Sequence, residues 1–284
     1  MQLGISSWTF PWAIGVPGFT PPRPFALADL LAAAARLQVG VVQIADNLPL
    51  HKLDASELRD ACQQAANLGL TIEVGTRGIE PAHLLRYLDL ASEFDSALLR
   101  TLIDTPESDP SLQPAEKWIR EVLPEFAGAG VAIAIENYER HSCRDLAALV
   151  RRLESRHVGI CLDTVNSLGA LETPEQVVGT LAPLTLNLHV KDFTIARVPQ
   201  KMGFLVSGAP AGEGRLDIPW LLRQMAQNNN AVSAVLEQWP PRQESIAATV
   251  AMERDWAERG IRYLRSCGCT SETEQSPDSN VRMR

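Results

Sequence analysis

Short aliphatic segments recur along the chain and alternate with longer segments of helical periodicity. The short segments are rich in Val, Ile and Leu and end in polar or turn residues, as strands do. The expected strands are residues 3–8, 40–46, 70–76, 97–104, 131–137, 157–163, 184–192 and 231–239. The expected helices are residues 25–37, 54–68, 79–94, 114–129, 142–155, 218–227 and 243–265, with a shorter sixth connection at 173–181.

Strands that alternate with helices pair in parallel, and eight such units are the number that closes a barrel. We therefore predict an α/β fold, a (β/α)8 TIM barrel, as one catalytic domain over residues 1–266. Residues 267–284 are polar and are expected to form a disordered tail. An open doubly wound sheet is the alternative, but no Gly-rich phosphate loop follows the first strand.

The polar face of the strand LTLNLHVKD is the strongest sign of a site. Its alternate Leu and Val residues are expected to face the outer helices, which sends His189 and Lys191 into the barrel lumen. The same rule sends three acids on the neighbouring strands inward: Glu136, Asp163 and Glu237. Consecutive strands thus each place a potential metal ligand near the C-terminal mouth, where barrel active sites lie.

These four residues together predict a metal site. A single acid at a strand end is more often a helix cap, and a single His is more often a hydrogen-bonded core residue. Three carboxylates at one mouth, however, would raise each other's pKa unless a cation neutralised them. We therefore expect one divalent metal ion bound by Glu136, Asp163, His189 and Glu237. The ligand types suit Mn²⁺, Mg²⁺, Co²⁺ or Zn²⁺ and do not choose between them.

Further polar residues are candidates for substrate binding. Glu73 faces inward by the same rule, and Arg100 is expected to do so with Asp104. Together with Lys191, Arg100 supplies cations that either neutralise these acids or bind the anion of a sugar acid or sugar phosphate.

Two loops extend this expectation. Trp8 and Trp12 lie in a long Gly/Pro-rich segment after the first strand, where they either line a sugar pocket or pack on the barrel rim. The long segment after the seventh strand contains Arg197 and Arg215. Its length is typical of a lid or specificity loop.

The net charge of −8 argues against binding of nucleic acid, which needs clustered Lys and Arg. No apolar run reaches the length of a membrane span, and the N-terminus does not resemble a signal peptide, so a cytoplasmic location is expected. The expected partner is a small-molecule sugar or sugar acid, and the sequence is compatible with a homo-oligomer.

Several motifs carry a resemblance to a known family. They are IEN at Glu136, CLDTVN at Asp163, HVKD at His189, LEQW at Glu237, and GEGRLDIPWLL after the seventh strand. Over residues 2–265 the chain resembles the xylose isomerase-like TIM barrel superfamily of sugar phosphate isomerases and epimerases. The resemblance implies one divalent metal held by those four residues, with a substrate carbonyl and hydroxyl chelated to it.

The chain also departs from that pattern. Many epimerases of the group have a His shortly after the sixth-strand Asp, whereas Asn166 stands here. An amide can hydrogen-bond a substrate but cannot shuttle a proton at neutral pH. The segments WAIGVPG and MGF, with GEGRLDIPWLL, resemble a branch that includes 3-oxo-isoapionate decarboxylase. Endonuclease IV shares the fold, but the other histidines lie in expected loops or helices or at a strand start, and the acidic balance disfavours DNA.

The expected function is therefore a metal-dependent enzyme on a sugar or sugar acid that works through a metal-stabilised enediolate. Decarboxylation of a 3-oxo sugar acid ranks above isomerisation or 3-epimerisation of a ketose or sugar phosphate. A non-catalytic sugar-binding barrel is the remote alternative. In an epimerase, Glu136 and Glu237 would remove and return a proton. In a decarboxylase, Lys191 would be the acid or would bind the departing carboxylate.

Overall fold

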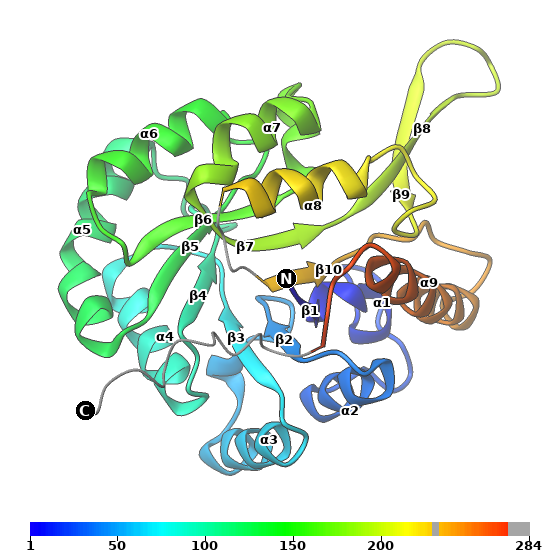
Figure 1. Cartoon of the computed structure of the whole chain (residues 1–284). Helices are drawn as coiled ribbons and strands as arrows, with labels where there is room; N and C mark the ends of the chain where they lie inside the picture. Colours follow the sequence, from blue (N-terminus) through cyan, green and yellow to red (C-terminus); the bar gives the residue numbers. More distant parts are fainter. Residues whose placement is uncertain (229–232, 272–284) are drawn as a thin grey trace, which may run out of the picture.

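The computed structural model describes residues 1–228 and 233–271. Its parallel strands close into a barrel in the order β1-β10-β7-β6-β5-β4-β3-β2 (Figure 1), which confirms the predicted TIM barrel. The strands are β1 (Gln2–Ser6), β2 (Val41–Ile44), β3 (Thr71–Gly75), β4 (Leu98–Thr101), β5 (Ala132–Glu136), β6 (Val158–Asp163), β7 (Thr185–Val190) and β10 (Ser233–Leu236). The predicted last strand, 231–239, begins at residues that lie outside the described ranges.

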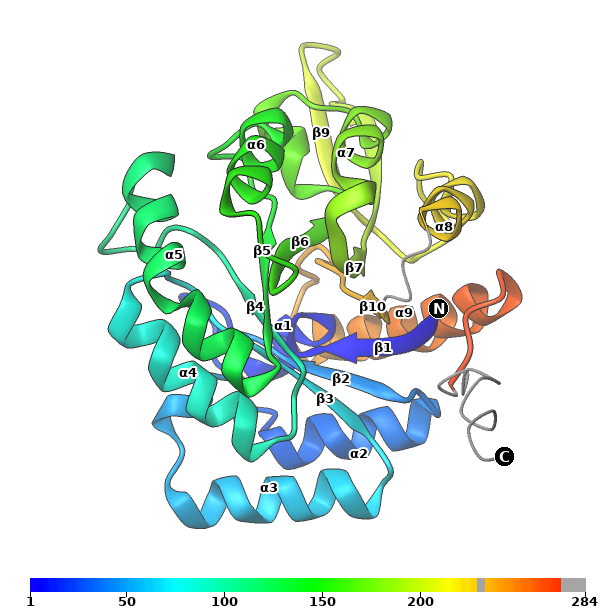
Figure 2. The same ribbon diagram turned by 60° about the vertical axis from the view of Figure 1, so that its left-hand side comes forward.

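Helices surround the barrel, as Figures 1 and 2 show from two sides. They are α1 (Pro11–Ile14), α2 (Leu27–Leu37), α3 (Ala55–Asn67), α4 (Pro81–Glu93), α5 (Leu112–Ala129), α6 (Cys143–Leu153), α7 (Pro174–Leu181), α8 (Ile218–Gln227) and α9 (Ile246–Ser266). Short 3-10 turns are η1 (Ser7–Thr9), η2 (Leu50–Lys52), η3 (Asn166–Ala170) and η4 (Ala182–Leu184). Across the two described ranges, no helix combines the length and the apolar character that crossing a membrane requires.

Local sequence signals explain where the helices begin and end. The side chain of Asp54 accepts hydrogen bonds from the backbone N–H groups of Ser56 and Glu57, so α3 begins there. Gly130 ends α5 in the left-handed conformation, with φ of 73°. Glycine adopts this conformation without the steric cost that a Cβ atom imposes.

The main core lies between the barrel and the helices. The outward positions of β5 and β6 are fully buried aliphatic residues, Ile133, Ile135, Ile160 and Leu162. Burial of such a side chain stabilises the fold by about 1.5–3 kcal/mol. Because side chains alternate along a strand, this burial fixes the intervening residues toward the lumen.

The segment after β7 differs in form from the predicted loop. It forms an antiparallel hairpin of β8 (Asp192–Arg197) and β9 (Phe204–Ala209), which projects from the barrel in Figures 1 and 2. The buried carboxylate of Asp192 fastens its base by accepting hydrogen bonds from the backbone N–H groups of Gly212, Gly214 and Leu216. Cross-strand pairing thus orders a segment that has no helical or core-strand pattern.

Packing at the C-terminal end continues beyond the predicted boundary at residue 266. Cys269 is buried, and Thr270 forms a parallel bridge with Gln2. The backbone N–H of Leu3 donates to the Thr270 carbonyl at 2.6 Å, so residue 270 pairs with the start of β1. Residues 272–284 of the predicted tail lie outside the described ranges.

Candidate active site

Four side chains of ligand type meet inside the C-terminal mouth of the barrel. Glu136 and Asp163 are the last residues of β5 and β6, His189 lies in β7, and Glu237 directly follows β10. The strand register pairs Asp163 with His189. None of the four is more than 3% exposed. The inward direction predicted from strand alternation therefore converges on one buried point.

The imidazole of His189 stands at the centre of this group. Its Nδ1 atom is 3.5 Å from Glu136 Oε2, 3.4 Å from Glu237 Oε2 and 3.9 Å from Asp163 Oδ2. Its Nε2 atom lies 2.7 Å from Oε1 of Gln43. Because an amide oxygen only accepts hydrogen bonds, Gln43 makes Nε2 the donor and directs Nδ1 at the three acids.

Three buried atoms in this group have no hydrogen-bond partner: His189 Nδ1, Asp163 Oδ2 and Glu237 Oε2. The two oxygens form ion pairs with Lys191 Nζ, at 2.7 and 2.9 Å, without normal hydrogen-bond geometry. All three atoms lie within 4.8 Å of one another. Buried polar groups rarely lack partners, so this set fits a bound divalent cation.

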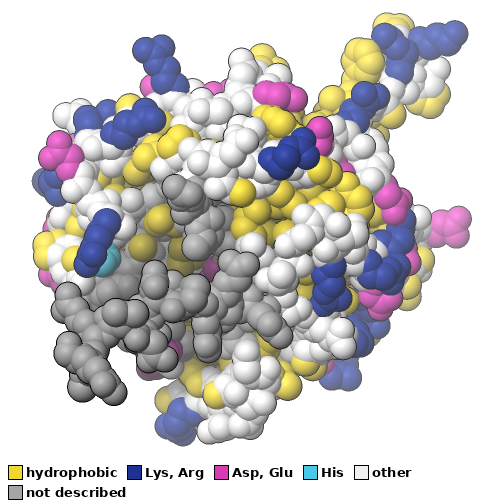
Figure 3. All heavy atoms as spheres, in the orientation of Figure 1, with side chains coloured by type: hydrophobic (Ala, Val, Ile, Leu, Met, Phe, Trp, Pro, Cys, Tyr) yellow, Lys and Arg dark blue, Asp and Glu magenta, His cyan; other side chains and the backbone are white. Residues whose placement is uncertain are grey.

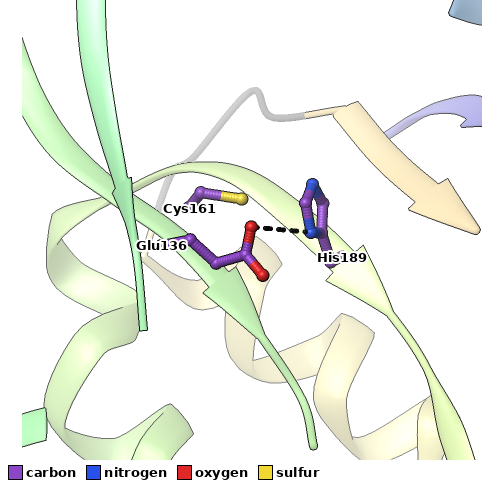
Figure 4. A group of neighbouring side chains, drawn as sticks. All are labelled: Glu136, Cys161 and His189. Atoms are coloured by element: carbon purple, nitrogen blue, oxygen red, sulfur yellow. Dashed lines mark ion pairs between the residues drawn. The ribbon is translucent and has the colours of Figure 1, made fainter. Parts of the chain in front are cut away.

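Cys161 lies beside the same imidazole. Figure 4 shows Glu136 and His189 directed at each other, with the Cys161 thiol next to them. The thiol donates to Oδ1 of Asn187 at 3.1 Å, and its burial raises its pKa well above the usual value. A metal needs the thiolate, so Cys161 is a weaker ligand candidate than the carboxylates.

Charges oppose burial throughout the group. Burial alone would raise the pKa of Glu136 and Glu237, but the positive charges of Arg100, His189 and Lys191 hold both below the usual range. Burial dominates at Asp163 and raises its pKa. It would lower the pKa of His189 and Lys191, yet the neighbouring carboxylates raise both. Without a metal, the acids are therefore balanced by protonated side chains.

Arg100 and Asn166 hold Glu136 in place. Arg100 Nε donates to Glu136 Oε2, and Nη1 donates to Asp46 Oδ1 at 2.9 Å and to the Thr76 carbonyl at 3.0 Å. Asn166 Nδ2 donates to the other oxygen of Glu136 at 2.7 Å. The guanidinium of Arg100 is thus engaged by carboxylates rather than directed at a free anion site.

A pocket of about 260 Å³ opens above these residues. Its lining contains the predicted residues Trp8, Arg100, Glu136, Asn166, Lys191 and Glu237. A larger hollow of about 980 Å³ lies outside the barrel beside α3 and the end of α4 and touches none of them. The smaller pocket therefore contains the candidate active-site residues.

Four predicted substrate-binding residues lie away from the pocket lining. Trp12 Nε1 donates to the Pro240 carbonyl at 2.9 Å, on the barrel rim. Glu73 lies deeper in the lumen and bonds to Gln43, Asn187 and Ser233. Arg197 covers the ring of Phe204 in the hairpin, and Arg215 is bonded to the Ile195 carbonyl at 3.4 Å.

Among the seven pocket residues that were not predicted site residues, four carry a charged or aromatic side chain: Asp46, Arg77, Tyr138 and Trp239. Arg77 is held from behind by Asp104, with Nε donating to the backbone carbonyl at 3.0 Å and Nη2 to Oδ2 at 2.5 Å. Its guanidinium carbon lies 5.4 Å from the centre of the Tyr138 ring, and its side chain is 27% exposed. Each of the four lies at or just past the C-terminal end of a strand, which is the signal that could have found them.

The closed parallel barrel places this chain in the TIM-barrel class. Its C-terminal mouth holds a candidate metal site made of buried acids and an imidazole. Within that class, the chain belongs to the xylose isomerase-like TIM barrel family, whose model matches residues 19–267.

Similar proteins include both decarboxylases and epimerases. The chain is 35% identical to 3-oxo-isoapionate decarboxylase of Pectobacterium atrosepticum, over 93% of this chain and 95% of that protein. D-psicose 3-epimerase from Clostridium cellulolyticum H10 has the same fold, with a TM-score of 0.72, 15% identity and coverage of 95% and 100% of the two chains. A xylose isomerase-like protein from Mycobacterium smegmatis, solved in complex with magnesium, gives a TM-score of 0.68 at 16% identity over 92% and 97%.

Proposed function

We propose that this chain is a divalent-metal-dependent decarboxylase of a 3-oxo sugar acid, of the 3-oxo-isoapionate type. The observation that carries the proposal is the 35% identity to 3-oxo-isoapionate decarboxylase, which extends over nearly the whole of both chains. The pocket supports it, because the cationic side chains of Arg77, Arg100 and Lys191 line the same pocket as the candidate metal ligands Glu136 and Glu237.

Glu136, Asp163, His189 and Glu237 are the residues that would hold the metal. The last three each have a buried atom that makes no hydrogen bond, and these atoms with the hard oxygen donors fit Mn²⁺, Mg²⁺, Co²⁺ or Zn²⁺. When bound, such an ion supplies a Lewis acid that polarises the ketone oxygen of the substrate.

Lys191 is the proposed proton donor, and the carboxylates that raise its pKa are those whose charge the metal would neutralise. Its side chain is 14% exposed and lines the pocket, beside both Asp163 and Glu237. In a 3-oxo acid, the bond between the carboxyl carbon and its neighbour breaks, and the electron pair moves toward the ketone oxygen as carbon dioxide leaves. A proton from Nζ of Lys191 then adds to the carbon that lost the carboxylate.

Arg77 is the proposed binding residue for the substrate anion. Both guanidinium groups pair with carboxylates, Arg100 with Glu136 and Asp46 and Arg77 with Asp104, but the side chain of Arg77 is 27% exposed at the pocket and that of Arg100 only 3%. A guanidinium held in this way is prepared to pair with a carboxylate. Trp8, Tyr138 and Asn166 complete the proposed substrate contacts.

Isomerisation or 3-epimerisation of a ketose is the second candidate. It is favoured by the near-symmetric placement of Glu136 and Glu237, at 3.5 and 3.4 Å from His189 Nδ1. Two carboxylates could exchange a proton on the two faces of a substrate. The hydrogen bonds from Arg100 and Asn166 to Glu136 reduce its basicity and favour the decarboxylase.

The test is a panel of 3-oxo sugar acids and ketoses incubated with metal-loaded protein in deuterated buffer. The proposal expects carbon dioxide release from a 3-oxo acid, with one deuterium in the product. Deuterium uptake into a ketose without carbon dioxide release would instead establish the epimerase. Protein treated with a chelator serves as the control and is expected to be inactive until metal is restored.

A further inference from the structure

The hairpin of β8 and β9 exposes a concentration of large apolar side chains. Among the residues that the structure describes, five of the eight exposed large hydrophobic residues lie in it: Ile195, Met202, Phe204, Leu205 and Val206. Met202 is 86% exposed. Figure 3 shows hydrophobic side chains along the projecting hairpin, with Lys and Arg side chains toward its end. Single exposed hydrophobic residues are normal, but such a cluster marks an interaction surface.

The edges of the hairpin are also open to backbone hydrogen bonding. In the described part of the chain, β8 and β9 form a sheet of their own, so the outer edge of each strand has no neighbouring strand. An isolated two-stranded hairpin is marginally stable in water, and open edges readily accept another chain. Both properties favour a hairpin that is covered in the assembled protein.

A complementary surface lies on the neighbouring loop between β6 and α7. Leu171, which directly follows η3, is 91% exposed, the largest exposure among the large hydrophobic residues of the described ranges. Because β6 and β7 are adjacent in the barrel, this loop and the hairpin flank the same mouth. One chain therefore carries the apolar hairpin and the exposed side chain of Leu171 at the same end of the barrel.

The charges of the two surfaces are opposite. Residues 193–209 contain Arg197 and Lys201 and no acid, whereas residues 166–181 contain Glu172 and Glu175 and no Lys or Arg. Glu175 is exposed at the first turn of α7. The basic hairpin is thus unusual in a chain of net charge −8, and its complement lies on the same chain.

We propose that the hairpin docks on the loop around Leu171 and Glu175 of a second copy of this chain, and that the second copy reciprocates. Two surfaces that complement each other on one chain can both be satisfied by a two-fold axis, which closes the assembly as a dimer. Phe204 and Leu205 supply the apolar contact, and Arg197 and Lys201 face Glu175, since Glu172 accepts the backbone N–H of Cys143 within its own chain. This inference is independent of the reaction that the pocket catalyses.

Sedimentation velocity over about 1–100 µM of the full chain tests the proposal. The wild type is expected to form a dimer. The variant F204S/L205S is expected to weaken dimerisation at least about tenfold, because it removes the apolar contact. Leu68→Ser is the matched control, since Leu68 is 40% exposed and follows the end of α3 that leads into β3, at the opposite end of the barrel from the mouth, and it should leave the dimer unchanged. A monomeric wild type, or a dimer that persists in F204S/L205S, would overturn the proposal.

A charge exchange identifies the receiving surface. Lys201→Glu and Glu175→Lys should each weaken the dimer, and their combination should restore it, because the opposite charges are again paired. Thermal unfolding of each variant checks that α7 remains folded. Weakening by the hairpin substitutions with no restoration in the double variant would show that the partner surface is not the Leu171 loop, and the proposal would fail.

Discussion

Two polar clusters fill the barrel lumen at different depths, and they differ in how their atoms are satisfied. The deeper cluster consists of Gln43, Glu73, Asn187 and Ser233. Gln43 Nε2 donates to Glu73 and Asn187 at 2.9 and 3.0 Å, and Asn187 Nδ2 donates to Glu73 and Ser233 at 2.8 and 2.6 Å. In the upper cluster of Glu136, Asp163, His189 and Glu237, three buried atoms make no hydrogen bond, and two of these are held only by ion pairs with Lys191.

This difference separates a structural role from a binding role. Burial raises the pKa of Glu73, and its oxygens accept hydrogen bonds from the neutral side chains of Gln43, Asn187 and Ser233. The upper cluster gathers three acids where no such neutral arrangement exists. Buried polarity by itself therefore does not mark a site, whereas buried polarity without partners does.

The largest expected effect is loss of the metal on removing His189. His189→Ala deletes Nδ1, and metal affinity is expected to fall by more than about a hundredfold, because changes even in residues that only support a ligand cost 10–100-fold. Metal content after dialysis and carbon dioxide release from a 3-oxo acid measure it. Circular dichroism should show an intact fold.

Glu73→Gln is the matched variant in the deeper cluster. The amide can accept from Gln43 and Asn187 and donate to Ser233, so metal content should stay at the wild-type level. Loss of metal in both variants to the same degree would contradict the division into two clusters.

The second effect concerns Lys191, which joins the upper cluster to the pocket. Lys191→Met keeps the length of the side chain but removes the proton donor, and decarboxylation should slow by about 10²–10⁴-fold. Lys191→Arg retains the charge and should not recover the rate, because a guanidinium does not release its proton. Full activity in the Arg variant would show that charge alone is required.

The third effect, smaller than that of replacing Lys191, is weaker substrate binding when Arg77 is removed. Arg77→Ala deletes a hydrogen bond to a charged group, worth about 1.5–3 kcal/mol, and KM for a 3-oxo acid should rise by about 10–100-fold. The substitution Arg215→Ala, on a residue away from the pocket, is the control. An unchanged KM would remove Arg77 from the proposed anion site.

The barrel could be predicted because strands alternate with helices along the chain. The four residues of the upper cluster could be predicted because side chains alternate between the two faces of each strand. The sequence does not distinguish the two clusters, since Glu73 obeys the same inward rule as Glu136 and only the cross-strand partners differ. Arg77 was not predicted because it lies one residue past its predicted strand, where the alternation of side chains no longer sets their direction. The hairpin was not predicted because its strands pair only locally, with each other, and lack a buried face.

Another buried carboxyl, that of Glu253 on α9, sharpens the comparison because its oxygens are hydrogen-bonded and it lies outside both clusters. Its oxygens accept the backbone N–H groups of Trp12 and Ala13 at 2.8 and 3.0 Å. Burial outweighs these bonds and raises its pKa from 4.5 to about 8. The folded chain therefore keeps this proton over a pH range in which the unfolded chain releases it.

The sign of the resulting pH dependence follows from proton binding. Between pH 4.5 and about 8 the folded state binds the extra proton, so this group's contribution to stability is fully present below 4.5 and is lost as the pH rises to 8. The slope is at most about 1.4 kcal/mol per pH unit. Glu253→Gln cannot titrate, so the free energy of unfolding of the variant relative to the wild type should increase from pH 5 to pH 8, measured by urea denaturation. A difference that is constant with pH would mean that the two backbone hydrogen bonds hold the carboxylate ionised and outweigh the effect of burial on the pKa of Glu253.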